Sequence, residues 1–162
     1  MECSPRLLIL GIGNLLMGDE GVGVHAIRAL EKERLPDSVE TLDGGTGGFH
    51  LLSCLDEYPT VIVIDATMDG SEPGTVRIIK PRFLSDYPRS LGAHDIGLRD
   101  LIESAALLGT LPMVHLITVS VADIRSATTE LTPAVQRALV QVVESVQRIL
   151  CEEKFQSSDT GP

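Results

Sequence analysis

The chain has 162 residues, of which 43% are hydrophobic, and this is typical of one globular domain with a substantial core. Its formal net charge of −10 comes from 13 basic and 23 acidic residues. The basic residues are scattered, which argues against a nucleic-acid binder. The acidity serves solubility or favours a basic partner or a metal.

Two features of the sequence bear on the compartment. The N-terminal segment MECSPRLLILG lacks the basic stretch, separate apolar stretch and cleavage site of a signal peptide, and no apolar run approaches the roughly 18 residues that span a membrane. The three cysteines are widely spaced without a CxxC pair, which argues against a disulfide framework or a zinc knuckle. We therefore expect a cytoplasmic protein that is not bound to a membrane.

Short apolar runs alternate with segments of helical periodicity along most of the chain. The run Thr60 to Ala66 is the clearest strand, because it is β-branched and apolar on both faces. Pro36 ends the first predicted helix, and Pro133 stands in the first turn of the last. In chain order we predict a strand at 6–10, a helix at 21–35, a strand at 39–42, a helix at 49–58, strands at 60–66 and 75–79, a helix at 96–108, a strand at 113–121 and a helix from 132 to about 151.

This alternation predicts an α/β fold of three layers, with a twisted, mostly parallel five-stranded sheet between helices. The connection between strands 60–66 and 75–79 is too short for a helical crossover, so we expect that pair to be antiparallel. No internal repeat or linker is present, and residues 1–150 are expected to form a single domain. The polar segment 151–162 is expected to be a flexible tail.

Several polar residues follow the predicted strands, where sites form in an open parallel sheet. Asp19 and Glu20 follow the first strand, Asp43 follows the second, Asp65 closes the third, and His94 precedes a later helix. A carboxylate at the end of a buried strand costs desolvation free energy unless a group pairs with it. Glu20, Asp65 and His94 would offer two oxygens and one nitrogen to a divalent metal such as nickel or zinc, with other positions open.

These residues also have simpler interpretations. Asp19 fits the N-cap of the following helix, and Glu20 would interact favourably with the helix dipole. We expect the remaining histidines to be packed or surface residues rather than ligands. They are His25, His50 and His115.

The stretch GIGNLLMGDEGVGVH begins like a dinucleotide-binding turn. Gly11 and Gly13 fit the G-x-G-x-x-G pattern, but Leu16 takes the third glycine position. Asp19 and Glu20 then stand where pyrophosphate would bind, and like charges at ~4 Å repel by several kcal/mol. A nucleotide or nucleoside enzyme on a similar sheet is thus a disfavoured alternative, and the lack of GK[ST] excludes a Walker loop.

A set of segments, taken in order, resembles the endopeptidases that mature [NiFe] hydrogenases. They are GIGNLLMGDEGVGVHAI, LDGGTGG, VIVIDA followed by EPGTV, AHDIGL and LTPAV, from about Leu8 to the helix after Thr132. The combination is specific, although no single segment would be. The resemblance implies a nickel-dependent endopeptidase that removes a short C-terminal extension from a hydrogenase large-subunit precursor after nickel insertion. It also implies a twisted sheet between helices.

The resemblance assigns nickel recognition to Glu20, Asp65 and His94. It implies that the nickel is supplied by the precursor rather than held as a resident cofactor, and it implies no organic cofactor. An incomplete set of ligands would complete the coordination of nickel already bound to the precursor. Only a nickel-loaded precursor would then dock well, which is specificity by differential affinity.

Two routes to hydrolysis stay open, since the chain has no HExxH helix and no GxSxG elbow. Nickel could polarise the scissile carbonyl or activate water. A carboxylate, with Asp43 as the candidate beside Glu20 and Asp65, could instead act as general base in an aspartic-type reaction. Backbone amides of the glycine-rich segment would bind the precursor's tail or an oxyanion, or the glycines would only permit a tight turn. The candidate substrate-binding residues are Gly44, Gly45 and Thr46.

A second hypothesis shares every one of these motifs. It is a non-catalytic, nickel-sensing chaperone or binding module for the same precursor. In both cases the expected partner is the [NiFe] hydrogenase large-subunit precursor. We expect a monomer that binds neither nucleic acid nor membrane.

Overall fold

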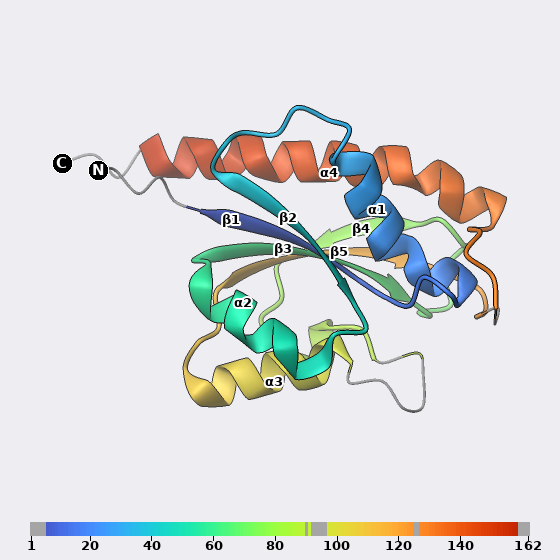
Figure 1. Cartoon of the computed structure of the whole chain (residues 1–162), viewed down its shortest axis with the longest axis horizontal. Coiled ribbons are helices and arrows are strands. Elements are labelled where there is room, and N and C mark those ends of the chain that lie inside the picture. The colour runs from blue at the N-terminus through green and yellow to red at the C-terminus, as the bar shows by residue number, and fades with distance from the viewer. Residues whose placement is uncertain (1–5, 90, 92–96, 125–126, 159–162) are drawn as a thin grey trace.

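The computed structural model describes residues 6–89, 91, 97–124 and 127–158, with side chains as far as residue 153. The chain folds into three layers, with a five-stranded sheet between two pairs of helices (Figure 1). Helices α1 (Val22–Leu30) and α4 (Pro133–Ser158) cover one face, and α2 (Leu51–Glu57) and α3 (Leu98–Leu108) cover the other. The predicted three-layer α/β fold is confirmed.

The sheet has the strand order β2-β1-β3-β5-β4. All neighbouring strands are parallel except β4, which pairs antiparallel with β5. The orientation of β4 relative to β3 is as predicted, but the expected direct pairing of these two strands is wrong. The strand β5 pairs with β3 along its whole length and occupies that edge, so β4 is left with the outer edge of β5. The strands are β1 (Leu7–Ile12), β2 (Val39–Gly45), β3 (Thr60–Thr67), β4 (Val76–Ile79) and β5 (Met113–Ser120).

Alternating side chains of the central strands enter two separate apolar cores. Ile62 and Ile117 pack in the core that includes α1 and α4, whereas Val63 and Leu116 pack in the core that includes α2 and α3. All four side chains are fully buried. The period-two alternation of a strand thus serves both faces, as the doubly apolar sequence of β3 predicts.

The first predicted helix is shorter than expected at both ends. A 3-10 turn, η1 (Gly18–Gly21), precedes α1, and the helix ends at Leu30 instead of residue 35. Residues 31–34 are all exposed, so no core contact continues the helix. Bonds of the 3-10 type from the N–H groups of Lys32 and Glu33 close it, at 3.2 and 3.0 Å.

The other boundaries differ in the opposite direction. The strand β2 continues to Gly45, so the first glycines of DGGTGG belong to the strand. The helix α4 continues to Ser158, through most of the segment expected to be a flexible tail. Its apolar side chains Ile149 and Leu150 remain in the core, and Glu153 contacts His115 of β5. Two further 3-10 turns are η2 (Gly48–His50) and η3 (Leu84–Asp86).

Within the described part of the chain, no helix combines the length and apolar composition that crossing a bilayer requires.

Glycines allow the turn after β1 to pack closely against the start of α1. A Cβ on Gly23 would lie 2.3 and 2.5 Å from backbone carbonyl oxygens of β1 and β3, and one on Gly11 would lie 2.2 Å from the carbonyl oxygen of Gly23. Gly13 has a φ of 141°, and a Cβ there would lie 1.9 Å from the carbonyl oxygen of Glu20. The glycines that look like part of a phosphate loop therefore serve backbone packing.

We expect Gly23→Ala to lower the free energy of unfolding by about 3 kcal/mol, because the added methyl group meets backbone on two strands. Gly109→Ala is the matched control, since Gly109 has a φ of 72° but no atom within 4 Å of the added Cβ. The control should lose only about 1 kcal/mol. Urea unfolding followed by circular dichroism measures both. Equal losses in the two variants would contradict the tight contact at Gly23.

Candidate functional site

Two of the predicted carboxylates, Glu20 and Asp65, line one small pocket beyond the carboxyl end of the sheet. Glu20 lies in η1 after β1, and Asp65 lies in β3, so the parallel pairing of β1 with β3 brings them to the same edge. The pocket has a volume of about 30 Å³, which is room for an ion or a water molecule. We call it the acidic pocket; its walls also include Gly13, Gly45 and Thr46.

The acidic pocket is electrostatically suited to a cation. Glu20 is 7% exposed. Burial raises the pKa of Asp65 to about 8; the hydrogen bond from the Ala66 N–H at 2.8 Å opposes this shift, and the charge of Glu20 adds to it. A positive charge between the two carboxylates would remove their mutual repulsion and favour the ionised form of Asp65.

The third predicted ligand, His94, lies outside the described residues. Among the residues that the structure describes, no three or more potential metal ligands come together. Glu20 and Asp65 alone would leave most coordination positions of a divalent metal to be filled by other ligands. The assignment of His94 stays a prediction.

Asp19 plays a different part from its neighbour Glu20. It is 4% exposed, and its two carboxylate oxygens accept hydrogen bonds from the backbone N–H and the hydroxyl of Thr132, at 2.7 and 2.8 Å. Thr132 directly precedes α4, so Asp19 fixes the start of that helix against η1. The expected N-cap of the following helix is not found, since neither η1 nor α1 has a side-chain cap. The carboxylate caps a helix distant in sequence instead.

Asp43 does not line the acidic pocket. Its side chain is exposed at the end of β2, and its Oδ1 accepts a hydrogen bond from the N–H of Gly45 at 3.0 Å. This is the local bond of an Asx turn. It stabilises a backbone in which Gly45 has a φ of 48°. The structure thus gives Asp43 a role in the turn, and its assignment as general base stays a prediction.

The glycine-rich segment contributes to the pocket unevenly. Gly45 and Thr46 line the acidic pocket and also a neighbouring small pocket beside α2 and α3. Gly44 is buried, and a Cβ there would lie 2.8 Å from the Leu10 side chain and 3.1 Å from the carbonyl oxygen of Gly11. Gly44 is therefore required for packing against β1.

Two backbone amides of the glycine-rich segment are already used within the turn. The N–H of Gly45 donates to Asp43, and the N–H of Gly47 donates to the carbonyl oxygen of Gly44 at 2.9 Å. Gly48 has a φ of 55°, which favours glycine. These contacts favour the tight-turn interpretation of the segment.

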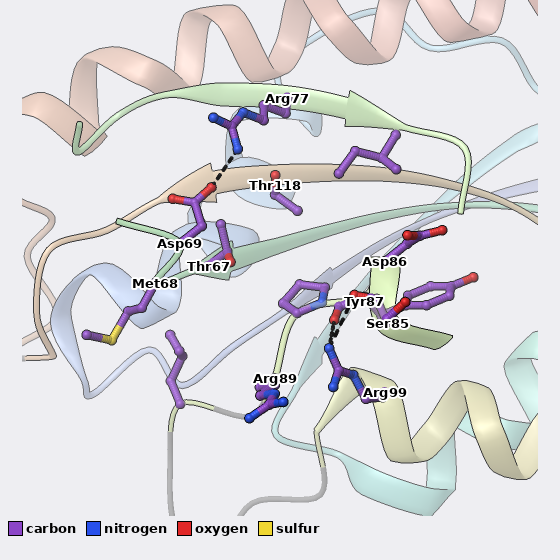
Figure 2. Close-up of a pocket in the computed structure, with 13 residues that line it drawn as sticks. Thr67, Met68, Asp69, Arg77, Ser85, Asp86, Tyr87, Arg89, Arg99 and Thr118 are labelled. Carbon is purple, nitrogen blue, oxygen red and sulfur yellow. Dashed lines mark hydrogen bonds and ion pairs between the residues drawn. The ribbon is translucent and has the colours of Figure 1, made fainter. Parts of the chain in front are cut away.

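Figure 2 shows a larger pocket, of about 340 Å³. It adjoins the acidic pocket, since Arg89 and Leu91 line both. Its floor is formed by β3, β5 and β4. No sequence pattern indicates this pocket, because its floor depends on β4 pairing with β5 rather than with β3. We call it the arginine pocket; among its lining residues are Asp69, Arg77, Asp86, Arg89, Arg99 and Thr118.

The three histidines expected to be packed or surface residues are so in the structure. His115 is buried in β5, and its Nε2 lies 2.6 Å from Oε1 of Glu153 in α4. His25 is partly exposed, and its Nε2 lies 2.9 Å from the carbonyl oxygen of Thr129. His50 is exposed at the end of η2. None of them lines the acidic pocket.

The raised pKa of Asp65 makes the stability of the free protein depend on pH. Between the ordinary pKa of 3.8 and the folded value of about 8, the folded state binds more protons than the unfolded state, so stability falls as the pH rises through this window. Part of the side chain still contacts solvent. We therefore expect Asp65→Asn to be about 1–3 kcal/mol more stable than the wild type at the alkaline end of the window. Urea unfolding across the window, with a chelator present, measures this; identical pH profiles would contradict it.

We expect Asp19→Ala to lower the free energy of unfolding by about 2–3 kcal/mol, because it removes the acceptor of two hydrogen bonds at the start of α4. Asp123→Ala is the matched control, since Asp123 is exposed and makes no hydrogen bond with a described residue. The control should change stability by less than about 0.5 kcal/mol. Thermal unfolding compares them. A small and equal effect of both substitutions would show that the Asp19–Thr132 contact contributes little.

Comparisons with known proteins agree on one family. A family model described as hydrogenase maturation protease, HycI, matches residues 24–149. The hydrogenase expression/formation protein HupD of Rhizobium leguminosarum bv. viciae is 36% identical over 153 residues, which is 91% of this chain and 75% of that protein. The hydrogenase 2 maturation protease of Escherichia coli is 32% identical over 150 residues, which is 91% of this chain and 92% of that protein.

A solved structure is similar over the same extent. The hydrogenase maturating endopeptidase HybD from E. coli aligns with a TM-score of 0.81 and 33% identity, covering 91% of this chain and 93% of that chain. The matched family model spans most of the chain, from α1 into α4. The chain therefore belongs to the hydrogenase maturation protease family and is an endopeptidase.

Proposed function

We propose that this endopeptidase removes a C-terminal extension from the precursor of a [NiFe] hydrogenase large subunit, and that it requires nickel already bound to that precursor. Family membership supplies the reaction class, and the names of the relatives connect them to hydrogenase maturation. The observation that carries the nickel requirement is the acidic pocket. There Glu20 and Asp65, from separate elements, share a space the size of an ion.

The incompleteness of the acidic pocket suits a metal that arrives with its substrate. Two carboxylates, with His94 as the predicted third ligand, leave positions that ligands from the precursor would fill. A nickel-free precursor would bring no positive charge between Glu20 and Asp65, so the pKa of Asp65 would stay raised. Nickel-loaded and nickel-free precursors would therefore differ in affinity, and that difference is the basis of selection.

The scissile bond would lie next to the acidic pocket, where nickel could polarise its carbonyl group or activate water. Glu20 and Asp65 face this space, whereas Asp43 is occupied by its own turn. We therefore favour metal-directed positioning with assistance from a pocket carboxylate. Asp43→Asn tests the other route, because the amide keeps the oxygen that accepts the Gly45 N–H. Loss of cleavage without loss of stability would assign Asp43 as the general base.

The two alternative functions have less support. Membership of a protease family favours an enzyme over a non-catalytic, nickel-sensing module. A nucleotide enzyme is disfavoured for two reasons. Backbone atoms occupy the space beside the glycines of the β1–α1 turn, and both carboxylates of η1 stand where phosphate would bind. Cys54 and Cys151 are free thiols, which supports the reducing cytoplasm as the proposed compartment. The protein is proposed to act as a monomer.

We expect the purified protein to cut a nickel-loaded large-subunit precursor and to leave the nickel-free precursor intact. Glu20→Gln and Asp65→Asn should each reduce cleavage by about 10²-fold or more, because each removes a negative charge from the acidic pocket. Asp123→Asn is the control for loss of one surface carboxylate and should cut normally. Intact-mass spectrometry of the large subunit follows the reaction. Equal cleavage of both precursors would contradict the nickel requirement, and cleavage of neither would contradict the proposed substrate.

A further inference from the structure

The arginine pocket lies directly beside the acidic pocket on the same face of the sheet. Strand register places Asp65, Thr118 and Arg77 in one row across β3, β5 and β4, and paired residues of a sheet point to the same face. Neighbouring strands are ~4.8 Å apart, so about 10 Å separate the backbone at Asp65 from that at Arg77. A ligand bound in the acidic pocket is therefore within a few residues' reach of the arginine pocket.

The arginine pocket is cationic, although the chain has a net charge of −10. Among the residues that the structure describes, its charged lining consists of three arginines and two aspartates. Both aspartates accept hydrogen bonds or form an ion pair within the protein. Asp69 forms an ion pair with Arg77 at 2.9 Å, and Asp86 accepts two backbone N–H groups of its own loop at 2.8 and 2.9 Å. The three arginines outnumber the two aspartates, so the described lining carries a net positive charge.

The arginines of the pocket differ in the hydrogen bonds and ion pairs that they already make within the protein. Arg99 holds the wall of the pocket, because its Nη2 donates to the carbonyl oxygens of Tyr87 at 2.6 Å and Ser85 at 3.4 Å. Arg89 is exposed and makes no hydrogen bond or ion pair with any residue that the structure describes. Figure 2 shows Arg89 across the pocket from the Arg77–Asp69 pair. Arg89 also lines the acidic pocket, so it stands at the border between the two.

We propose that the arginine pocket binds an extended segment of the precursor next to the scissile bond, and that Arg89 pairs with a carboxylate of that segment. This inference rests on the proposed function. A planar guanidinium binds a carboxylate through two hydrogen bonds, and the volume of about 340 Å³ is typical of a binding site. An extended chain rises ~3.3 Å per residue, so about three residues cover the ~10 Å from Asp65 to Arg77, and Arg89 lies at the border between the two pockets.

Steady-state cleavage of the nickel-loaded precursor tests the role of Arg89. Arg89→Gln is expected to raise KM about tenfold and to leave kcat within about twofold, because the pairing of Arg89 with the segment is the same before and during cleavage. Arg82→Gln is the matched control, since Arg82 is an exposed arginine of the same loop outside the arginine pocket. The control should behave like the wild type.

Three kinetic outcomes would overturn the proposal: an unchanged KM in Arg89→Gln, an equal rise of KM in both arginine variants, or a fall of kcat alone. Failure of the wild type to cut would instead count against the proposed function. The wild type therefore tests the proposed function, and the comparison of Arg89→Gln with the wild type tests the arginine pocket.

Synthetic peptides with the sequence of the extension identify the carboxylate, which comes from a side chain or from the free C-terminus. One peptide has a free C-terminus and another an amidated one, and further peptides replace each Asp or Glu by its amide. Calorimetric titration should find one change that weakens binding to the wild type about tenfold and has no further effect on Arg89→Gln. If every peptide binds the wild type and Arg89→Gln equally well, the proposal is overturned.

Discussion

The close contact between the turn after β1 and the start of α1 decides where the carboxylates of the candidate site lie. The backbone of Gly13 meets the carbonyl of Glu20, and Gly23 rests against carbonyl groups of β1 and β3. These approaches are possible only without a Cβ. They hold η1 on the carboxyl end of the sheet, so that Glu20 is turned toward Asp65 and away from solvent. Backbone packing thus imposes a costly burial of charge.

Asp19 and Glu20 are adjacent in η1 but face different surroundings: Asp19 contacts the start of α4, and Glu20 lines the acidic pocket. Asp19 is compensated from within the protein, because Thr132 donates two hydrogen bonds to it and the start of α4 is fixed in return. In the acidic pocket, the pKa of Asp65 stays raised by burial and by Glu20. The first carboxylate therefore stabilises the fold, while in the acidic pocket a bound cation would favour the ionised form of Asp65.

The parts of this arrangement that local sequence encodes could be predicted, and the parts that depend on distant partners could not. The apolar run of β3 and the rule that sites follow strand ends were enough to place Glu20 and Asp65 together. The contact of Asp19 with Thr132 joins residues 113 positions apart, and no local pattern reveals it. The position of β4 depends on which strand takes the free edge of β3. Without the position of β4, neither the row from Asp65 to Arg77 nor the arginine pocket could be predicted.

The two pockets demand opposite charges within about 10 Å, and this constrains the kind of ligand that satisfies both. A free metal ion would fill only the acidic pocket, and a free acidic peptide would fill only the arginine pocket. A polypeptide that carries a bound cation and, a few residues away, a carboxylate would satisfy both at once. Linking two contacts makes the second one intramolecular, so each can be modest while the pair is selective. Such an endopeptidase would bypass other acidic tails and other metal sites without a deep cleft.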